Sequence, residues 1–340
     1  MSGVERDGGL PAITALGSAR RTLVLAIILG VASIASLTAG LTLGSVPIGI
    51  VQVLDSIFAP MPGVVHDVIW NLRAPRALAA FACGGLLALA GALLQVLLRN
   101  ALADPYILGV SGGASLGALL ALTIGTGTAV MNLSAFAGAV AAIVIVFGLT
   151  YRTADWNIYR LLLTGVVLSA GLSALISLTL VLAPDAQVKG MLFWLMGDLS
   201  QSESAWPAWI VLIGASGFAI VVALQLDLLA LGELKARSLG VAVGALQLGV
   251  FATAAVVTVA AVVVGGAIGF IGLMAPHAIR LAGVTHHRAL VPLAVLLGGS
   301  LLTIADTAAR TAWAPQQLPV GIFTALLGVP AMLILLGRQR

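Results

Sequence analysis

Charged side chains are scarce in this chain of 340 residues, and their scarcity excludes most soluble proteins. Lysine, arginine, aspartate and glutamate together make up 8% of the residues, whereas about a quarter of an ordinary soluble domain is charged. Hydrophobic residues make up 61%, so too little polar surface exists to cover a water-soluble globule. The composition also excludes a disordered chain and a nucleic-acid-binding module. It predicts an integral membrane protein.

The sequence also lacks the residues that several kinds of chemistry need. Cys83 is the only cysteine, so no disulfide can form within the chain. Lysine occurs only at Lys189 and Lys235, and no phosphate-binding loop of the usual glycine-rich kind is present, so ATP would have to be bound by another subunit. The histidines are not at ligand spacing with cysteine or acidic residues, so no zinc site is expected. The adjacent His286 and His287 are expected in a solvated turn.

Long apolar stretches predict ten membrane-spanning helices. A span needs about 20 mostly apolar residues to cross a hydrocarbon core of about 30 Å, and continuous rather than alternating apolar stretches favour helices over a β-barrel. The predicted spans are 22–42, 77–98, 105–124, 130–150, 161–183, 205–226, 243–264, 267–283, 290–308 and 319–337. The eighth is short and contains Pro276, so we expect a broken or partly buried helix. The sequence thus predicts one all-α membrane domain over residues 20–340, after a mobile cytoplasmic tail over residues 1–19.

The distribution of lysine and arginine predicts the orientation of the chain. An even number of spans places both termini on one side. With the termini in the cytoplasm, only four of the 16 lysines and arginines fall outside, as the positive-inside rule requires. We therefore expect a multi-pass protein of the cytoplasmic (inner) membrane with both termini inside. The first apolar stretch is longer than a signal-peptide core of about 7–15 residues, which favours a retained helix over a cleaved signal.

Two stripes of small residues recur at helical spacing. The first consists of Gly109, Gly113 and Gly117. Residues four apart share a helix face, and this stripe favours close helix packing over a ligand cradle. The second consists of Gly165, Ser169, Ser173 and Ser177. Because hydroxyl groups gain nothing from facing lipid, this face should contact either another helix or a watery path, and the spacing leaves both open.

Three arginines lie at predicted outer ends of spans, where the positive-inside rule disfavours them. Arg73 and Arg76 precede the second span, and Arg310 follows the ninth span, four residues after Asp306. We expect their guanidinium groups to be exposed, where they could bind carboxylates of a soluble partner. The alternative is that Asp306 pairs with Arg310 within its helix while Arg73 and Arg76 anchor to lipid head groups.

The largest predicted cytoplasmic connector, residues 227–240, has the pattern of a short amphipathic helix. The residues that would share one face of it are Leu228, Leu231, Leu234 and Ser238. Such a helix could lie on the bilayer or dock in a groove of a partner. Two cations offset by two acidic residues make a weak anchor to anionic lipid, so docking to a protein is favoured.

Seven short motifs occur in order along residues 70–337. They are Arg73-x-Pro75-Arg76, Gln95 with Asn100-Ala-Leu-Ala-Asp-Pro105, Leu108-Gly-Val-Ser-Gly-Gly-Ala114, Trp194-Leu-Met-Gly197, Leu231-Gly-Glu-Leu-Lys-Ala-Arg-Ser-Leu-Gly240, Gly269-Phe-Ile-Gly-Leu-Met-Ala-Pro-His-Ala-Ile-Arg280 and Leu318-Pro-Val-Gly321. Together they resemble the FecCD family of ABC-transporter permeases, which includes iron-siderophore, haem and vitamin B12 importers. The sequence departs from the family pattern at Ala101, which is usually proline, and at Gln317, which is usually glutamate.

The resemblance implies a type II ABC importer permease with ten helices that forms a homodimer. Two ATPase subunits would bind on the cytoplasmic side, and a periplasmic or lipid-anchored substrate-binding protein outside. The permease would bind no cofactor and catalyse no reaction, since ATP and Mg²⁺ belong to the ATPase subunits. The permease would move its cargo across the membrane by alternating access. The implied cargo is a ferric siderophore or haem, with cobalamin as the alternative. An ion-coupled secondary transporter is a distant alternative, because the centres of spans three to seven lack ionisable residues.

The resemblance also assigns roles to particular positions. A coupling helix for the ATPase, at about 229–240, would include Leu231, Gly232, Glu233, Leu234, Ala236, Arg237, Leu239 and Gly240. The positions that would dock the binding protein are Arg73, Arg76 and Arg310. The cytoplasmic gate would comprise Asn157, Ile158 and Tyr159. The translocation path would be lined by Ser169, Ser173 and Ser177.

Overall fold

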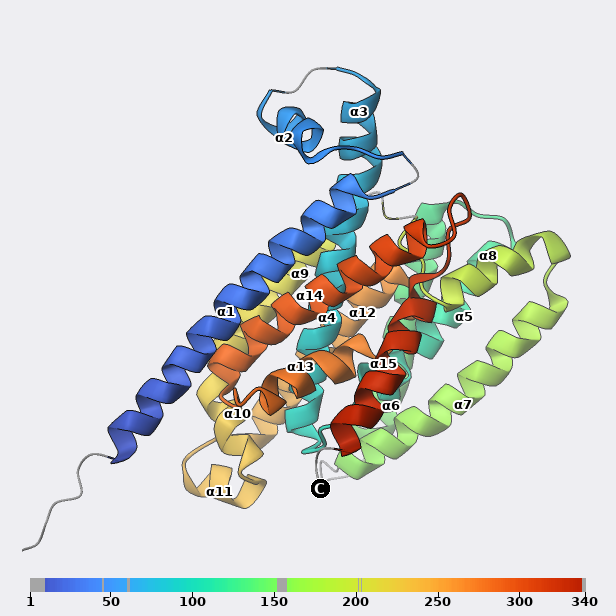
Figure 1. Ribbon diagram of the computed structural model, residues 1–340. Helices are drawn as coiled ribbons and strands as arrows, with labels where there is room; N and C mark the ends of the chain where they lie inside the picture. The colour runs from blue at the N-terminus through green and yellow to red at the C-terminus, as the bar shows by residue number, and fades with distance from the viewer. Residues whose placement is uncertain are drawn as a thin grey trace, which may run out of the picture.

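The computed structural model describes residues 10–44, 46–59, 62–151, 158–200, 202 and 204–337, and regular structure within them is exclusively helical (Figure 1). The longest helices are α1 (Leu10–Thr42), α4 (Ala74–Leu97), α6 (Thr128–Tyr151), α7 (Ile158–Leu182), α12 (Val243–Gly265) and α14 (His287–Thr311). Shorter apolar helices are α5 (Val110–Thr123), α9 (Trp206–Val221), α10 (Ala223–Ala230), α13 (Ile271–Leu281) and α15 (Val320–Gly337). The remaining elements are α2 (Ile50–Phe58), α3 (Val64–Asp67), η1 (Val68–Arg73), η2 (Pro105–Leu108), α8 (Asp185–Leu195) and α11 (Glu233–Ser238).

Each of the ten predicted spans coincides with one of these helices or with two consecutive ones. Six helices are long and apolar enough to cross a membrane in the part of the chain that the structure describes, and α9 and α10, bent by 63°, would add a seventh as one broken span. The helices α5 and α15 are apolar but shorter, and α13 has 11 residues. The prediction of an all-helical multi-pass protein is confirmed, whereas the count of ten spans stays a prediction.

The first helix overlaps the segment that the sequence pattern assigns to an N-terminal tail. Residues 10–19, which the sequence analysis places in the tail, belong to α1. Residues 1–9 lie outside the described part of the chain, so the predicted mobility of the tail is untested. The apolar stretch that predicts the first span, residues 22–42, forms the C-terminal part of this helix.

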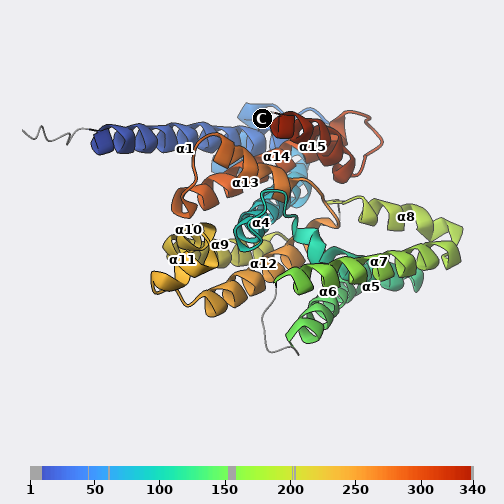
Figure 2. The same ribbon diagram turned by 90° about the horizontal axis from the view of Figure 1, so that it is seen from below.

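Helix α4 forms the centre of the bundle. Figure 2 shows it surrounded by α9, α12, α13 and α14, and nearly all its residues from Arg76 onward are buried. Its alanines and glycines allow this enclosure, because helices with small side chains can approach closely. A Cβ atom at Gly84 would clash with the carbonyl oxygen of Gly298 on α14, and one at Gly91 with that of Gly272 on α13.

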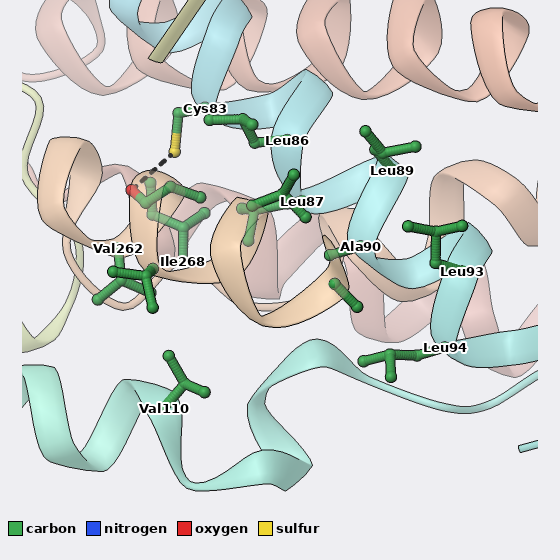
Figure 3. Close-up of a cluster of buried hydrophobic side chains, with 14 of the residues drawn as sticks. Cys83, Leu86, Leu87, Leu89, Ala90, Leu93, Leu94, Val110, Val262 and Ile268 are labelled. Atoms are coloured by element: carbon green, nitrogen blue, oxygen red, sulfur yellow. Dashed lines mark hydrogen bonds between the residues drawn. The ribbon is translucent and has the colours of Figure 1, made fainter. Parts of the chain in front are cut away.

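The apolar core extends from α4 to its neighbours on both sides. Figure 3 shows leucines of α4 packed together with Val110 of α5 and Val262 of α12. In the same cluster Cys83 donates its thiol hydrogen to the carbonyl oxygen of Ala261 at 3.3 Å. The buried thiol therefore has a partner within the core and belongs to the packing.

A second group of helices, α5, α6 and α7, packs beside this core. Gly113 and Gly117 of α5 lie against the carbonyl oxygens of Gly138 and Ser134 on α6, with no room for a Cβ atom. The predicted packing role of the glycine stripe is confirmed for these two positions. Gly109 differs, because it has φ of +74° and ends η2 rather than contacting α6.

Helix α13 is short and largely buried, in agreement with the expectation for the eighth span. It contains Pro276, which cannot donate a backbone hydrogen bond. The side chain of Gln95 on α4 donates to the carbonyl oxygen of Leu273 at 3.1 Å and accepts a hydrogen bond from Arg280. These contacts fix the polar end of α13 to α4.

Candidate functional site

The segment implied to be a coupling helix lies at the lower end of the molecule in Figure 1, opposite α2 and α3. The leucine spacing predicts a single helix through Leu228 and Leu234, and this prediction is wrong. Gly232 has φ of +114°, which no right-handed helix tolerates and which favours glycine. The segment therefore folds as two helices, α10 and α11, with a turn between them.

Helix α11 presents apolar side chains to its surroundings. Leu234 is 85% exposed, and Leu231 and Leu239, which flank the helix, are each 60% exposed. Ala236 is fully buried, so the opposite side of α11 packs on the body of the protein. We call the three leucines the α11 patch. An exposed apolar group of this kind is typical of a surface that another protein covers.

Glu233 connects α11 to two membrane helices. Its Oε1 atom accepts hydrogen bonds from Nη2 of Arg99, at 2.8 Å, and from Nε2 of Gln247, at 3.1 Å. Arg99 follows the end of α4 and Gln247 lies in the first turns of α12. A displacement of α11 would therefore pull on the central helix and on one of its neighbours.

A contact between α10 and α14 holds the other side of this segment. The Oδ1 atom of Asp227 accepts a hydrogen bond from the backbone N–H of His287 at 2.9 Å and lies 2.6 Å from its Nδ1 atom. His286 contacts the other carboxylate oxygen at 3.2 Å. His286 is exposed as expected, but the side chain of His287 is only 3% exposed. Sequence reasoning missed this pair because 60 residues separate its members.

The three outer arginines are buried, so the expectation that their guanidinium groups are exposed is wrong. Arg73 donates hydrogen bonds to the carbonyl oxygens of Leu41 and Thr42, at 2.7 and 2.8 Å, and to that of Val46. Leu41 and Thr42 end α1, where carbonyl groups lack helical partners and a cation is favourable. Arg73 thus caps α1, and these bonds occupy the guanidinium group that the sequence analysis expects at a partner or at lipid head groups.

Arg76 and Arg310 share one carboxylate. Arg76 donates to Asp306 through Nε and Nη2, the latter at 2.8 Å, and to Oε1 of Gln317 at 2.7 Å. Arg310 pairs with Oδ2 of Asp306 at 3.1 Å and donates to the carbonyl oxygen of Gly40 at 3.1 Å. The alternative that Asp306 pairs with Arg310 is confirmed. A docking role for these arginines stays a prediction.

The implied gate is only partly described. Asn157 lies outside the described residues, and Ile158 and Tyr159 form the start of α7. In the serine stripe on α7, the hydroxyl groups of Ser169 and Ser177 donate to backbone carbonyls of their own helix, at 2.8 and 2.9 Å. Ser173 and Ser177 are exposed, so within one chain no other helix covers this part of the stripe.

A half-buried carboxyl group fixes the start of η2. Asp104 accepts a hydrogen bond from the backbone N–H of Tyr106 at 2.8 Å. Burial raises the pKa of the Asp104 carboxyl, and the hydrogen bond from Tyr106 opposes that shift. The Tyr106 hydroxyl in turn donates to the carbonyl oxygen of Ile268 and accepts from its N–H, both at 2.9 Å. This short 3₁₀ helix is thereby joined to the segment that leads into α13.

Metal ligation finds no support in the described part of the chain. No three side chains of histidine, cysteine, aspartate or glutamate are grouped there as a metal site would require. The arrangement instead combines a packed helical bundle, a projecting apolar patch at one end and internal ion pairs at the other.

Comparisons with known proteins give one consistent family. A sequence model of the FecCD transport family matches residues 26–338. The hemin transport system permease protein HmuU of Yersinia pestis is 39% identical over 292 residues, which cover 81% of this chain and 86% of that protein. The cobalamin import system permease protein BtuC of Halobacterium salinarum is 40% identical over 283 residues, covering 81% and 75%. These two relatives have similar sequence identity to this chain, but their names give different cargoes.

Solved structures agree with the fold. An ABC transporter assigned to the metal-chelate type, in an inward-facing conformation, superposes with a TM-score of 0.79 at 27% identity, covering 93% of this chain and 99% of that chain. PsaBC from Streptococcus pneumoniae, solved in complex with Fab, gives a TM-score of 0.52 at 15% identity, which supports the fold alone.

Proposed function

Because the chain belongs to the FecCD transport family, we propose that it is the membrane-spanning permease subunit of an ATP-driven importer of an iron chelate or cobalamin. The family match over residues 26–338 carries this proposal. The chain provides the conduit and catalyses no reaction, and separate ATPase subunits bind ATP and Mg²⁺. The import cargo is a ferric siderophore or haem, with cobalamin as the alternative. Both kinds of cargo stay in the proposal because the relatives named for hemin and for cobalamin have nearly equal sequence identity to this chain.

The α11 patch is the proposed contact for the ATPase subunit. Covering a leucine side chain fully stabilises an interface by about 1.5–3 kcal/mol, and three leucines are available. Gly232 and Gly240, both with positive φ, set the turns that make α11 project, while Ala236 and Arg237 complete the coupling helix. Movement of α11 would pass through Glu233 to α4 and α12. ATP binding and hydrolysis would in this way switch the conduit between an outward-open and an inward-open state.

A second copy of the chain is the proposed partner for α7. Of the most apolar 18-residue stretch of this helix, only 6% is buried within one chain. The serine stripe is therefore largely uncovered, although its hydroxyl groups gain nothing from facing lipid. Pairing two copies along α7 and α15 would enclose the exposed Ser173 and Ser177 in a shared path, with the gate residues at its cytoplasmic end. The α11 patch and both termini would then face the cytoplasm, and a substrate-binding protein would dock on the opposite end.

Leu234→Glu tests the coupling assignment. The variant places a charge where the ATPase subunit would cover a leucine, so ATPase subunits should no longer copurify and uptake into proteoliposomes should stop. Val64→Glu is the matched control for copurification of the ATPase subunits, because Val64 is 80% exposed and lies at the opposite end of the bundle. Uptake by Leu234→Glu at the normal rate, or transport by the chain without any ATPase subunit, would refute the proposal.

A further inference from the structure

A pocket with both polar and apolar walls opens where α5 and α12 end and where α6 and α9 begin. It has a volume of about 980 Å³, within the range of about 300–1,000 Å³ that small-molecule sites occupy. Its walls include Asn132 of α6, Lys189 of α8 and Asp198, which follows α8. Lys189 and Asp198 give the pocket one positive and one negative charge. We call it the outer pocket.

The carboxylate in the outer pocket has a fixed position. Asp198 donates its backbone N–H to the carbonyl oxygen of Gly265, the last residue of α12, at 3.0 Å. Its two carboxylate oxygens accept hydrogen bonds from the backbone and hydroxyl groups of Ser200, at 2.8 and 2.7 Å. The negative charge is thus held at the end of α12.

An apolar groove continues from the outer pocket along α6, α9 and α12, which lie together in Figure 2. The groove has a volume of about 320 Å³ and shares Pro207, Val263 and Val264 with the outer pocket. Every residue that lines it is apolar. From Asn132 in the pocket to Ile143 in the groove, α6 rises about 16 Å. That is about half of a hydrocarbon core of about 30 Å, the depth that one acyl chain reaches.

The groove opens on an apolar, exposed face of the bundle, away from the proposed transport path. Phe136 and Val140 of α6 and Val256 of α12 line it and are partly exposed. Of the described residues, none from α7 or α15 lines either the groove or the outer pocket, whereas the proposed path runs along those two helices. An amphiphile could therefore enter sideways from the bilayer without entering the conduit.

We propose that the outer pocket and the groove bind one phospholipid with a zwitterionic head group. The ammonium group of Lys189 binds the lipid phosphate, the carboxylate of Asp198 binds the cationic amine of the head group, and one acyl chain lies along α6, α9 and α12. The opposite charges select this lipid class, since an anionic lipid such as phosphatidylglycerol would meet Lys189 favourably but would leave Asp198 without a cation. The bound lipid would close the gap between the three helices.

Native mass spectrometry of the full chain extracted from vesicles of equal phosphatidylethanolamine and phosphatidylglycerol tests this proposal. The wild type should retain one phosphatidylethanolamine in preference to phosphatidylglycerol. Lys189→Gln should lower retention about tenfold through loss of a charge-assisted contact, and Asp198→Asn should abolish the preference between the two lipids. Val140→Trp should fill the groove with the indole ring and displace both phosphatidylethanolamine and phosphatidylglycerol.

Two variants provide matched controls. Lys235→Gln removes the same charge at the other end of the molecule, and Val144→Trp places the same ring one turn further along α6, outside the groove; both should retain lipid as the wild type does. Wild-type retention by Lys189→Gln and Val140→Trp would overturn the proposal. So would loss of uptake in Val140→Trp with lipid retention unchanged, because the cavity would then belong to the cargo path.

Discussion

The carboxylate of Asp306 on α14 binds the guanidinium group of Arg76 on α4, with 2.8 Å between Oδ1 and Nη2, across 230 residues of sequence. The side chain of Asp306 is only 1% exposed, and it also pairs with Arg310. Two buried cations therefore depend on one carboxylate. Because Arg310 reaches the carbonyl oxygen of Gly40 on α1, this triad joins three helices at the end opposite α11.

Replacing Asp306 by alanine should destabilise the protein strongly. Removing one member of a buried ion pair costs about 3–5 kcal/mol, because the remaining charge stays desolvated. We expect a clear fall in the temperature of thermal unfolding in detergent, with no binding protein present. Asp185→Asn, at an exposed site on α8, should leave that temperature unchanged. An unaltered unfolding temperature for Asp306→Ala would remove the structural role and favour docking for the arginines.

The sequence predicts local relations between charges better than distant ones. The spacing of Asp306 and Arg310 already suggested their pairing, since residues four apart on a helix are neighbours. The contact with Arg76 joins two helices that are distant in sequence, and no spacing indicates it. The positive-inside rule places a charge relative to the membrane but not relative to other helices, which is why burial of the three arginines was missed.

Hydropathy predicts the helices of this protein well because each apolar stretch must satisfy its backbone within a helix. The stretches at 22–42 and 243–264 coincide closely with parts of α1 and α12. The division at Gly232 was missed, since the leucine pattern continues across it and only the backbone angle reveals the turn. The outer pocket was missed as well, because Lys189 and Asp198 come close to α6, α9 and α12 only through the fold.

Alanine at Gly113 should separate α5 from α6. The new Cβ atom would clash with the carbonyl oxygen of Gly138 and lie 2.8 Å from the Cβ of Ala142. Overpacking of this kind costs about 1–3 kcal/mol, which chemical unfolding in mild detergent can measure. Gly148→Ala on α6 is the control, because no atom lies within 4 Å of its new Cβ and alanine favours a helix by about 1 kcal/mol. Equal stability of the two variants would show that the close approach of α5 and α6 is not needed.

Alanine at Asp227 should loosen the joint between α10 and α14. The variant loses the acceptor for the His287 backbone N–H, an N-terminal cap of α14 that is worth about 0.5–2 kcal/mol. Because α10 leads into α11, amide hydrogen exchange should accelerate in residues 223–238. His286→Ala removes only the exposed partner and should exchange at nearly the wild-type rate. If Asp227→Ala exchanged no faster than His286→Ala, α10 would be held by other contacts.

The carboxyl group of Asp104 should make the stability of the folded protein depend on pH. Burial raises the pKa of its carboxyl in the folded protein, while the unfolded chain should titrate near the ordinary value of about 3.9. The folded state therefore holds the Asp104 proton more tightly than the unfolded chain does. The stability that the protonated carboxyl contributes is fully present below the pKa that Asp104 has in the unfolded chain, and it is lost as the pH rises through the pKa of Asp104 in the folded protein.

Asparagine at position 104 should remove this dependence while preserving the cap. Asparagine can accept the Tyr106 N–H bond as aspartate does, but it carries no charge to desolvate. We expect Asp104→Asn to unfold at a higher temperature than the wild type at pH 7, with the difference shrinking toward pH 4. The exposed-site variant Asp185→Asn should follow the wild-type curve throughout. A difference that widened on acidification would mean that the ionised form of Asp104 stabilises the fold, and that the hydrogen bond from Tyr106 outweighs the cost of burying the charge.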